Sequence, residues 1–199
     1  MDRFEALFFQ KTPPPRWAFL EKAIQALGRK PLVAAETGVS SDYCNGLSTV
    51  FWESRVEIEK AFSIDLSRSA LDSIERKVGR LEKISFSAAH SVFGLSALPN
   101  QSIDVLYLDS DLDPELMLHE ACAGLPKLRI PGMLIADDAD TKAPLLTRFL
   151  RGERIACKWP PYGGWKGRLD ALIEQAHPPG TFGMLSAMIT RFDGFEAVP

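Results

Sequence analysis

The chain has 199 residues, 46% of them hydrophobic, which predicts a single domain with a full core. A net charge of −3 and a pI near 5.7, without a Lys/Arg run, argue against nucleic-acid binding and favour a small or neutral partner. Three widely spaced cysteines form no CxxC motif, which argues against a disulfide framework and a zinc site and fits a reducing cytoplasm. The N-terminal sequence predicts neither a signal peptide nor a membrane span.

The first 16 residues are expected to form an arm apart from the core, because the stretch TPPPR breaks helices. Apolar residues at helical spacing from Trp17 to Leu27 then predict an amphipathic helix that stops at Gly28. One domain is therefore expected over residues 17–199. The separate arm also favours a homodimer.

Short apolar runs alternate with helical patterns from Pro31 onward. Runs of this kind are typical of strands buried on both faces, and their alternation with helices predicts βαβ units in a doubly wound, mostly parallel sheet. The expected strands cover residues 32–36, 61–65, 84–89, 103–109 and 132–138, and the expected helices cover 48–60, 67–83 and 114–129. Farther on, residues 141–153 read as a helix despite Pro144, 154–159 as a strand, 160–167 as a loop and 183–192 as the final strand.

Polar residues stand where each of the first five strands ends. Ligands bind at the carboxyl ends of parallel strands, because loops and helix N-termini meet there. Each such residue alone could be a turn former or a helix cap, but five in chain order indicate a site. They are Glu36, Asp65, His90 with Ser91, Asp109, and Asp137 with Asp138.

The loop after the first strand predicts close contact with a ligand. Gly38 and Gly46 would let the backbone approach it, and a helix starting near Ser48 would offer free N–H groups. The loop is neither GxGxxG nor a phosphate loop with its GK[ST], and a flexible loop with a capped helix is the alternative. Asp65, 29 positions after Glu36, is placed to accept hydrogen bonds from ribose hydroxyls, which suits S-adenosylmethionine and a nicotinamide cofactor alike.

These stretches, ETG…GLST, FSIDLS, AAHS, IDVLYLDSD and IPGMLIADDAD, resemble class I S-adenosylmethionine-dependent methyltransferases, and among them the small metal-dependent O-methyltransferases of the catechol and macrolide or sugar type. The resemblance covers roughly residues 17–140. It implies a Rossmann-like seven-stranded sheet of order 3-2-1-4-5-7-6 with helices on both faces and the last strand antiparallel. It also implies a cofactor site formed by Glu36, Thr37, Gly38, Gly46, Ser48, Asp65, His90, Ser91 and Asp109.

The same resemblance implies that Asp109, Asp137 and Asp138 hold a divalent cation, with Mg²⁺ expected. Three converging carboxylates repel one another, and a hard cation relieves that repulsion by taking oxygen ligands. Their spacing, 137 − 109 = 28 residues, leaves room for one crossover helix between adjacent strands. The alternative is that these residues cap helices and form turns, or line a substrate pocket without a metal.

The lysine that serves as general base in catechol-type enzymes is replaced by Leu112, so Asp109 and Asp111 are the candidate catalytic residues. The expected reaction is methyl transfer to a hydroxyl of a small molecule, which an aromatic loop over residues 159–167 would cover. A nicotinamide-dependent oxidoreductase and a non-catalytic S-adenosylmethionine-binding module remain the alternatives. The first lacks GxGxxG and a YxxxK pair, while the altered glycine loop motivates the second.

Overall fold

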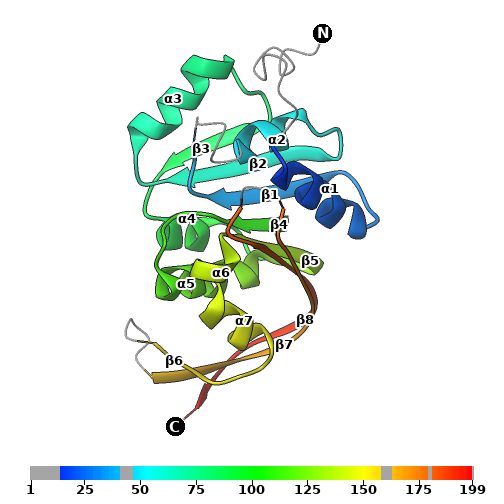
Figure 1. Cartoon of the computed structure of the whole chain (residues 1–199), viewed down its shortest axis with the longest axis vertical. Coiled ribbons are helices and arrows are strands. Elements are labelled where there is room, and N and C mark those ends of the chain that lie inside the picture. Colours follow the sequence, from blue (N-terminus) through cyan, green and yellow to red (C-terminus); the bar gives the residue numbers. More distant parts are fainter. Residues whose placement is uncertain (1–13, 41–46, 158–162, 179–180, 199) are drawn as a thin grey trace.

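A computed structural model of the chain describes residues 14–40, 47–157, 163–178 and 181–198 (Figure 1). No helix in those ranges is long and apolar enough to cross a membrane. The helices are α1 (Arg16–Ala26), α2 (Ser48–Ser54), α3 (Arg68–Val78), α4 (Ser91–Ala97), α5 (Pro114–Gly124), the 3-10 turn η3 (Leu125–Lys127), α6 (Ala139–Lys142) and α7 (Pro144–Leu150). The strands are β1 (Leu32–Thr37), β2 (Ile58–Asp65), β3 (Ile84–Ala88), β4 (Ile103–Leu108), β5 (Leu128–Asp137), β6 (Ile155–Cys157), β7 (Gly163–Ala176) and β8 (Met184–Val198).

All eight strands form one sheet in the order β3-β2-β1-β4-β5-β8-β7-β6. Strands β1 to β5 are parallel, and β8 runs antiparallel to β5, with Asp137 paired to Met184. The predicted order and the antiparallel last strand are therefore confirmed. The sheet has one strand beyond the predicted seven, the long strand β7, which lies between β8 and the edge strand β6 and pairs antiparallel with both.

Alternate residues of each central strand face opposite layers of helices. On one face, Val105 and Tyr107 of β4 pack with residues of α1, α2 and α3. On the other, Leu106 and Leu108 pack with residues of α4, α5 and α7. This period of two decides which helix meets each functional side chain, because a strand-end residue continues the alternation of its strand.

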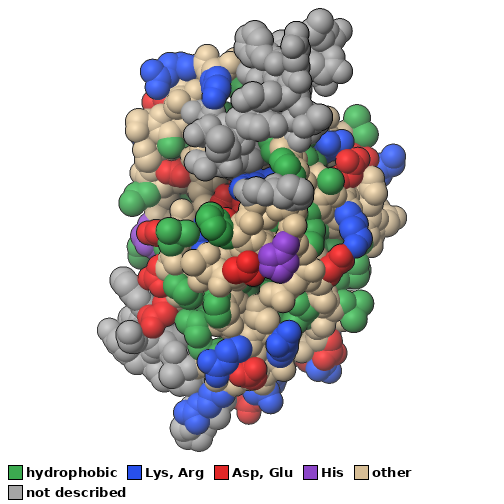
Figure 2. Space-filling view, in the orientation of Figure 1, with side chains coloured by type: hydrophobic (Ala, Val, Ile, Leu, Met, Phe, Trp, Pro, Cys, Tyr) green, Lys and Arg blue, Asp and Glu red, His purple; other side chains and the backbone are tan. Residues whose placement is uncertain are grey.

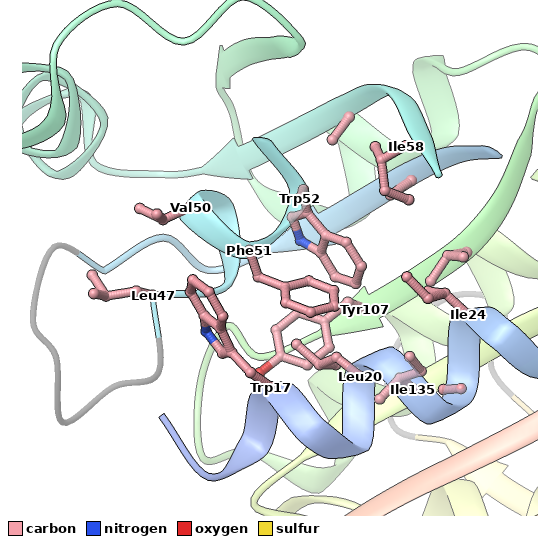
Figure 3. Packing of buried hydrophobic residues seen from close by; sticks show 14 of the residues in the cluster. Trp17, Leu20, Ile24, Leu47, Val50, Phe51, Trp52, Ile58, Tyr107 and Ile135 are labelled. Carbon is pink, nitrogen blue, oxygen red and sulfur yellow. The ribbon is translucent and has the colours of Figure 1, made fainter. Parts of the chain in front are cut away.

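An aromatic cluster holds α1 and α2 against the first of these faces (Figure 3). Trp17 of α1 packs edge-on against Phe51 at 5.4 Å between ring centroids, and Trp52 packs on Tyr107 at 5.9 Å. Trp52 and Tyr107 are completely buried. Large rings packed edge to face give specific geometry as well as apolar burial, so the start of α1 is fixed close to the end of β4.

Several predicted elements differ from the structure, and helix α4 was not predicted. The helix predicted over 48–60 ends at Ser54, because β2 already begins at Ile58. Pro144 is at the first position of α7 and separates it from α6, since proline fits the first turn of a helix but not its interior. The predicted loop over 160–167 partly belongs to β7, a long strand that pairs with β8 from Gly164 to Ala176.

Candidate functional site at the carboxyl ends of the parallel strands

Two adjoining cavities open where the parallel strands end. The larger, of about 410 Å³, is lined by Arg16, Gly38, Val39, Ser40, Ser48, Asp65, Asp109, Ser110, Asp138, Lys142 and Phe182. The smaller, of about 210 Å³, is lined by Gly38, Ile64, Asp65, Leu66, His90, Ser91, Ser110, Asp111 and Leu116. Gly38, Asp65 and Ser110 border both cavities, so a ligand with two parts could occupy them together.

Gly38 allows β1 and β4 to come close at the floor of the larger cavity. Its φ of +78° lies in the left-handed region, and a Cβ built on it would be 2.1 Å from the backbone oxygen of Asp109. Any other residue at this position would be strained and would force the two strand ends apart. The glycine predicted from the sequence is therefore required by the geometry of the site.

Asp65 ends β2 at the border of both cavities. Its Oδ2 accepts a hydrogen bond from the amide of Val39 at 2.8 Å, and its Oδ1 accepts one from the amide of Ser67 at 2.7 Å. The carboxylate is only half-buried. Each of its oxygens can accept a further bond, so ribose hydroxyls in the cavity could reach it.

Glu36, predicted to bind the cofactor, does not line either cavity. It is completely buried on the face of β1 that α2 covers, and it accepts hydrogen bonds from four side chains. The donors are Ser48, Thr49 and Trp52 of α2 and Ser63 of β2. Burial raises the pKa of Glu36, although these four donors oppose that shift. Glu36 thus positions the loop-to-helix segment that forms one wall, and Ser48, one of its donors, borders the larger cavity.

Of the next three predicted cofactor residues, two line a cavity and one does not: His90 and Ser91 do, and Thr37 does not. His90 and Ser91 border the smaller cavity, where exposed His90 lies 5.6 Å from the ring of Phe93. Thr37 is completely buried on the opposite face of β1 and does not reach either cavity. Asp111 is exposed at the rim of the smaller cavity and accepts a bond from the amide of Leu112 at 2.6 Å.

Asp137 is the most enclosed of the three clustered acids. It is completely buried, and its Oδ2 accepts hydrogen bonds from the hydroxyl of Tyr107 at 2.7 Å and from the guanidinium of Arg16. Its Oδ1 accepts one from the amide of Asp138 at 2.9 Å. Figure 3 shows the Tyr107 hydroxyl directed toward Trp17, the residue after Arg16 on α1. Asp137 therefore binds α1 to the strand end.

Lys142 lies between the other two acids. Its Nζ is 2.7 Å from Oδ1 of Asp109 and 3.1 Å from Oδ2 of Asp138, and only 4% of its side chain is exposed. Burial lowers the pKa of Lys142, but Asp109 and Asp138 outweigh that effect and raise it overall. The lysine is therefore held as a cation at the point where the acids converge.

Asp109 interacts with Lys142 and also with the charges of Asp137, Asp138 and Arg16. Burial and the neighbouring Asp137 raise its pKa to about 8, against the opposite effect of Lys142. Arg16 reaches its Oδ2 at 4.0 Å. Three acids facing two cations leave one excess negative charge, and holding a proton on Asp109 removes it.

The three acids do converge as the sequence predicted, but their oxygens do not fit a metal ion. Both oxygens of Asp137 already accept hydrogen bonds, and the ammonium of Lys142 lies between Asp109 and Asp138. Among the described residues, no group of three or more His, Cys, Asp or Glu side chains could hold a metal ion. The predicted Mg²⁺ site is therefore not confirmed.

The sequence interpretation missed both cations. Arg16 was assigned to the arm, yet it is the first residue of α1 and is buried. Lys142 is four residues after Asp138, a spacing that places both side chains on one face of a helix and could have indicated the pair. Gly46 and the aromatic residues Trp159 and Tyr162 lie outside the described residues, as does the proposed arm up to residue 13.

No protein-family model matches the chain, and no curated protein matches it in sequence. Solved structures do match in fold. A protein from Klebsiella pneumoniae with a provisional O-methyltransferase assignment aligns with a TM-score of 0.65 and 14% identity, over 96% of this chain and 91% of that one. A Geobacter sulfurreducens methyltransferase aligns with a TM-score of 0.60 and 16% identity, over 89% and 78% of the two chains.

A third structure is phosphoethanolamine N-methyltransferase 1 of Haemonchus contortus, with phosphoethanolamine and S-adenosylhomocysteine bound. It aligns with a TM-score of 0.60 and 12% identity over 97% of this chain, which spans 46% of the length of that enzyme. At such identities the likeness concerns the fold. The chain has the Rossmann-like methyltransferase fold, as the resemblance in its sequence implied.

Proposed function

We propose that the chain is an S-adenosylmethionine-dependent methyltransferase that methylates a hydroxyl group of a small molecule. The observation that carries this proposal is the pair of joined cavities over the strand ends, bordered by both Gly38 and Asp65. S-adenosylmethionine has two parts, a nucleoside and an amino acid, joined at the sulfonium centre. Two cavities that share a wall suit such a ligand.

Asp65 would hold the ribose hydroxyls, because its half-buried oxygens keep acceptor capacity beside the two backbone bonds. The smaller cavity, with His90 and Ser91, would receive the adenine base. Gly38 and Ser48 would face the methionine part in the larger cavity. Glu36 and Thr37 would contribute through the walls that they support.

In the reaction, the hydroxyl oxygen of the acceptor would form a bond to the methyl carbon while the bond from that carbon to sulfur breaks. The bonding electron pair passes to sulfur and yields S-adenosylhomocysteine, and the hydroxyl proton passes to a carboxylate. Asp111 borders the smaller cavity and is one candidate to accept it. Asp109 borders the larger cavity and can accept it only when deprotonated, above its pKa of about 8. The main contribution of the protein would be to align the two reactants.

The charges beside the larger cavity are mixed. Arg16 and Lys142 border it, and so do Asp65, Asp109 and Asp138. A hydroxyl acceptor is supported by the resemblance of the sequence to the small O-methyltransferases. On the described part of the face in Figure 2, acidic, basic and apolar side chains are interspersed, which suits a small acceptor better than an extended polyanion.

Divalent-metal assistance, which the sequence resemblance implied, is left out of this reaction, because Lys142 and Arg16 already engage the three acids. The proton transfer above requires only residues of this chain and the two reactants.

Titration calorimetry with S-adenosylmethionine, S-adenosylhomocysteine and NAD tests the proposal, followed by transfer of a labelled methyl group to a panel of alcohols, phenols and matched amines. We expect both sulfur compounds to bind, NAD not to bind, and hydroxyl acceptors to be labelled. Binding without transfer to any acceptor would support a non-catalytic binding module. Binding of NAD alone would contradict the proposal and support an oxidoreductase.

A further inference from the structure

The position of Lys142 follows from how the chain turns after β5. Asp138 has a left-handed backbone, with φ of 48°, a conformation that aspartate adopts more readily than most residues. The turn starts the short helix α6, where the amides of Thr141 and Lys142 donate to the carbonyl of Asp138 at 3.0 and 2.9 Å. The lysine side chain is thereby directed back toward the strand ends.

The ammonium of Lys142 bridges two acids from two different strand ends. Asp109 follows β4 and Asp138 follows β5, and these strands are neighbours in the sheet. The ammonium contacts one oxygen of each acid and is almost excluded from solvent. It therefore occupies the place where a small cation would contact both acids. The lysine supplies the positive charge covalently.

We infer that Lys142 is a built-in cation that takes the place of a divalent metal ion between Asp109 and Asp138, so that this site works without metal and acquires cation binding only when the lysine is removed. The inference concerns the site of the proposed function but does not rest on methyl transfer, because cation binding can be followed by protein stability alone.

The test compares the melting temperatures of the wild type and Lys142→Ala in Mg²⁺, Mn²⁺ or Ca²⁺ and after addition of a chelator. We expect neither cations nor chelator to shift the melting temperature of the wild type. In Lys142→Ala, the two acids lose their ammonium and gain free volume between them. Cations at ten times their dissociation constant should then raise the melting temperature by about 3 to 6 °C, and chelator should reverse the rise.

Two further variants separate a specific site from a general effect of lost charge. Lys22→Ala removes an exposed lysine that pairs with Glu174 on the surface, and it should show no cation response. Adding Asp109→Ala to Lys142→Ala removes one of the two acids and should abolish the response. If Lys142→Ala does not fold, Lys142→Gln replaces it, since glutamine also lacks the positive charge and its amide oxygen can ligate a hard cation.

A wild type that is stabilised by Mg²⁺ or Mn²⁺ as strongly as Lys142→Ala would overturn the inference, because the lysine would then not occupy the cation position. Folded Lys142 variants that ignore all three cations would overturn it as well. Neither result affects binding of S-adenosylhomocysteine, so failure of this inference is distinguishable from failure of the proposed function.

Discussion

Asp65 and Asp137 are both acids at the ends of parallel strands, yet their surroundings give them different tasks. Asp65 is half-buried at the border of two cavities, and within the described part of the chain its oxygens accept bonds from two backbone amides. Asp137 is completely buried and binds Tyr107, Arg16 and the amide of Asp138. One acid remains open to a ligand, and the other joins α1 to the sheet.

The difference comes from the elements that pack over each strand end. The aromatic cluster of Trp17, Phe51 and Tyr107 brings the first turn of α1 over β5, so Arg16 closes that end. Above β2 the chain continues into the exposed Leu66, and the carboxylate of Asp65 stays accessible. A strand-end acid therefore binds a ligand only where the neighbouring helices leave it uncovered.

Arg16→Ala should remove the buried ion pair with Asp137 and cause the largest loss of stability among these variants. It leaves the carboxylate of Asp137 buried without its cation, and such a loss costs about 3–5 kcal/mol of unfolding free energy. Urea denaturation of the wild type and the variant measures this difference in the free energy of unfolding.

Arg148→Ala is the matched control, because Arg148 forms a largely exposed pair with Glu153 and its loss should cost about 0–1 kcal/mol. Equal losses for the two arginines would mean that the buried pair has no special part in docking α1.

Gly38→Ala should disturb the open end. The new Cβ would meet the backbone oxygen of Asp109 at 2.1 Å in a left-handed conformation, so we expect a loss of about 1–3 kcal/mol of stability and weaker S-adenosylhomocysteine binding. Gly79→Ala provides the comparison, since Gly79 has nearly the same φ of +79° but nothing within 4 Å of the added Cβ. Equal losses would show that backbone conformation matters and close approach does not.

Asp65→Ala should weaken ligand binding without removing a buried ion pair. Loss of a charged acceptor for the ribose hydroxyls should weaken S-adenosylhomocysteine binding by about 1.5–3 kcal/mol in titration calorimetry. Asp72→Ala on the exposed part of α3 should leave the affinity unchanged. Asp65→Asn, with the same shape, keeps one oxygen acceptor and should fall between them. An affinity that Asp65→Ala leaves intact removes this residue from the site.

The smallest effect that we expect is a pH dependence of the free energy of unfolding, caused by Asp109. The folded pKa of Asp109 is about 8 and its ordinary value is 3.8, so the folded protein retains a proton that the unfolded chain has lost. This contribution to stability is fully present below about pH 4 and disappears as pH rises through 8. Relative to Asp109→Asn, the wild type should lose about 1 kcal/mol between pH 7 and 8.5, measured by urea denaturation. A gain over that range would reverse the sign and refute the raised pKa.

Much of this arrangement could be predicted from the sequence. Continuous apolar runs identified β1, β4 and β5, and carboxylates at their ends located the site, because strand ends of a parallel sheet share one edge. Whether an acid points into a cavity depends on the helix above it. Glu36 faces α2, and its oxygens accept hydrogen bonds from α2 side chains. No local pattern in β1 indicates this orientation.

The cations were harder to predict, because each comes from an element whose position is decided by packing. Arg16 follows three prolines and reads as part of an arm until Trp17 is seen docked on Phe51. Lys142 depends on the left-handed turn at Asp138. The long strand β7 was missed because its residues have only a weak strand pattern of their own, and it is stabilised by its antiparallel ladder with β8, the next strand in the chain.

Binding of S-adenosylmethionine in the two joined cavities, with Asp65 on the ribose, can be seen in a crystal structure with S-adenosylhomocysteine. We expect the ribose hydroxyls within hydrogen-bonding distance of Asp65 and the adenine beside His90 and Ser91. We expect the sulfur in the larger cavity, with Lys142 still between Asp109 and Asp138. Electron density for the ligand elsewhere on the protein, or a ribose that does not contact Asp65, would contradict this mode of binding.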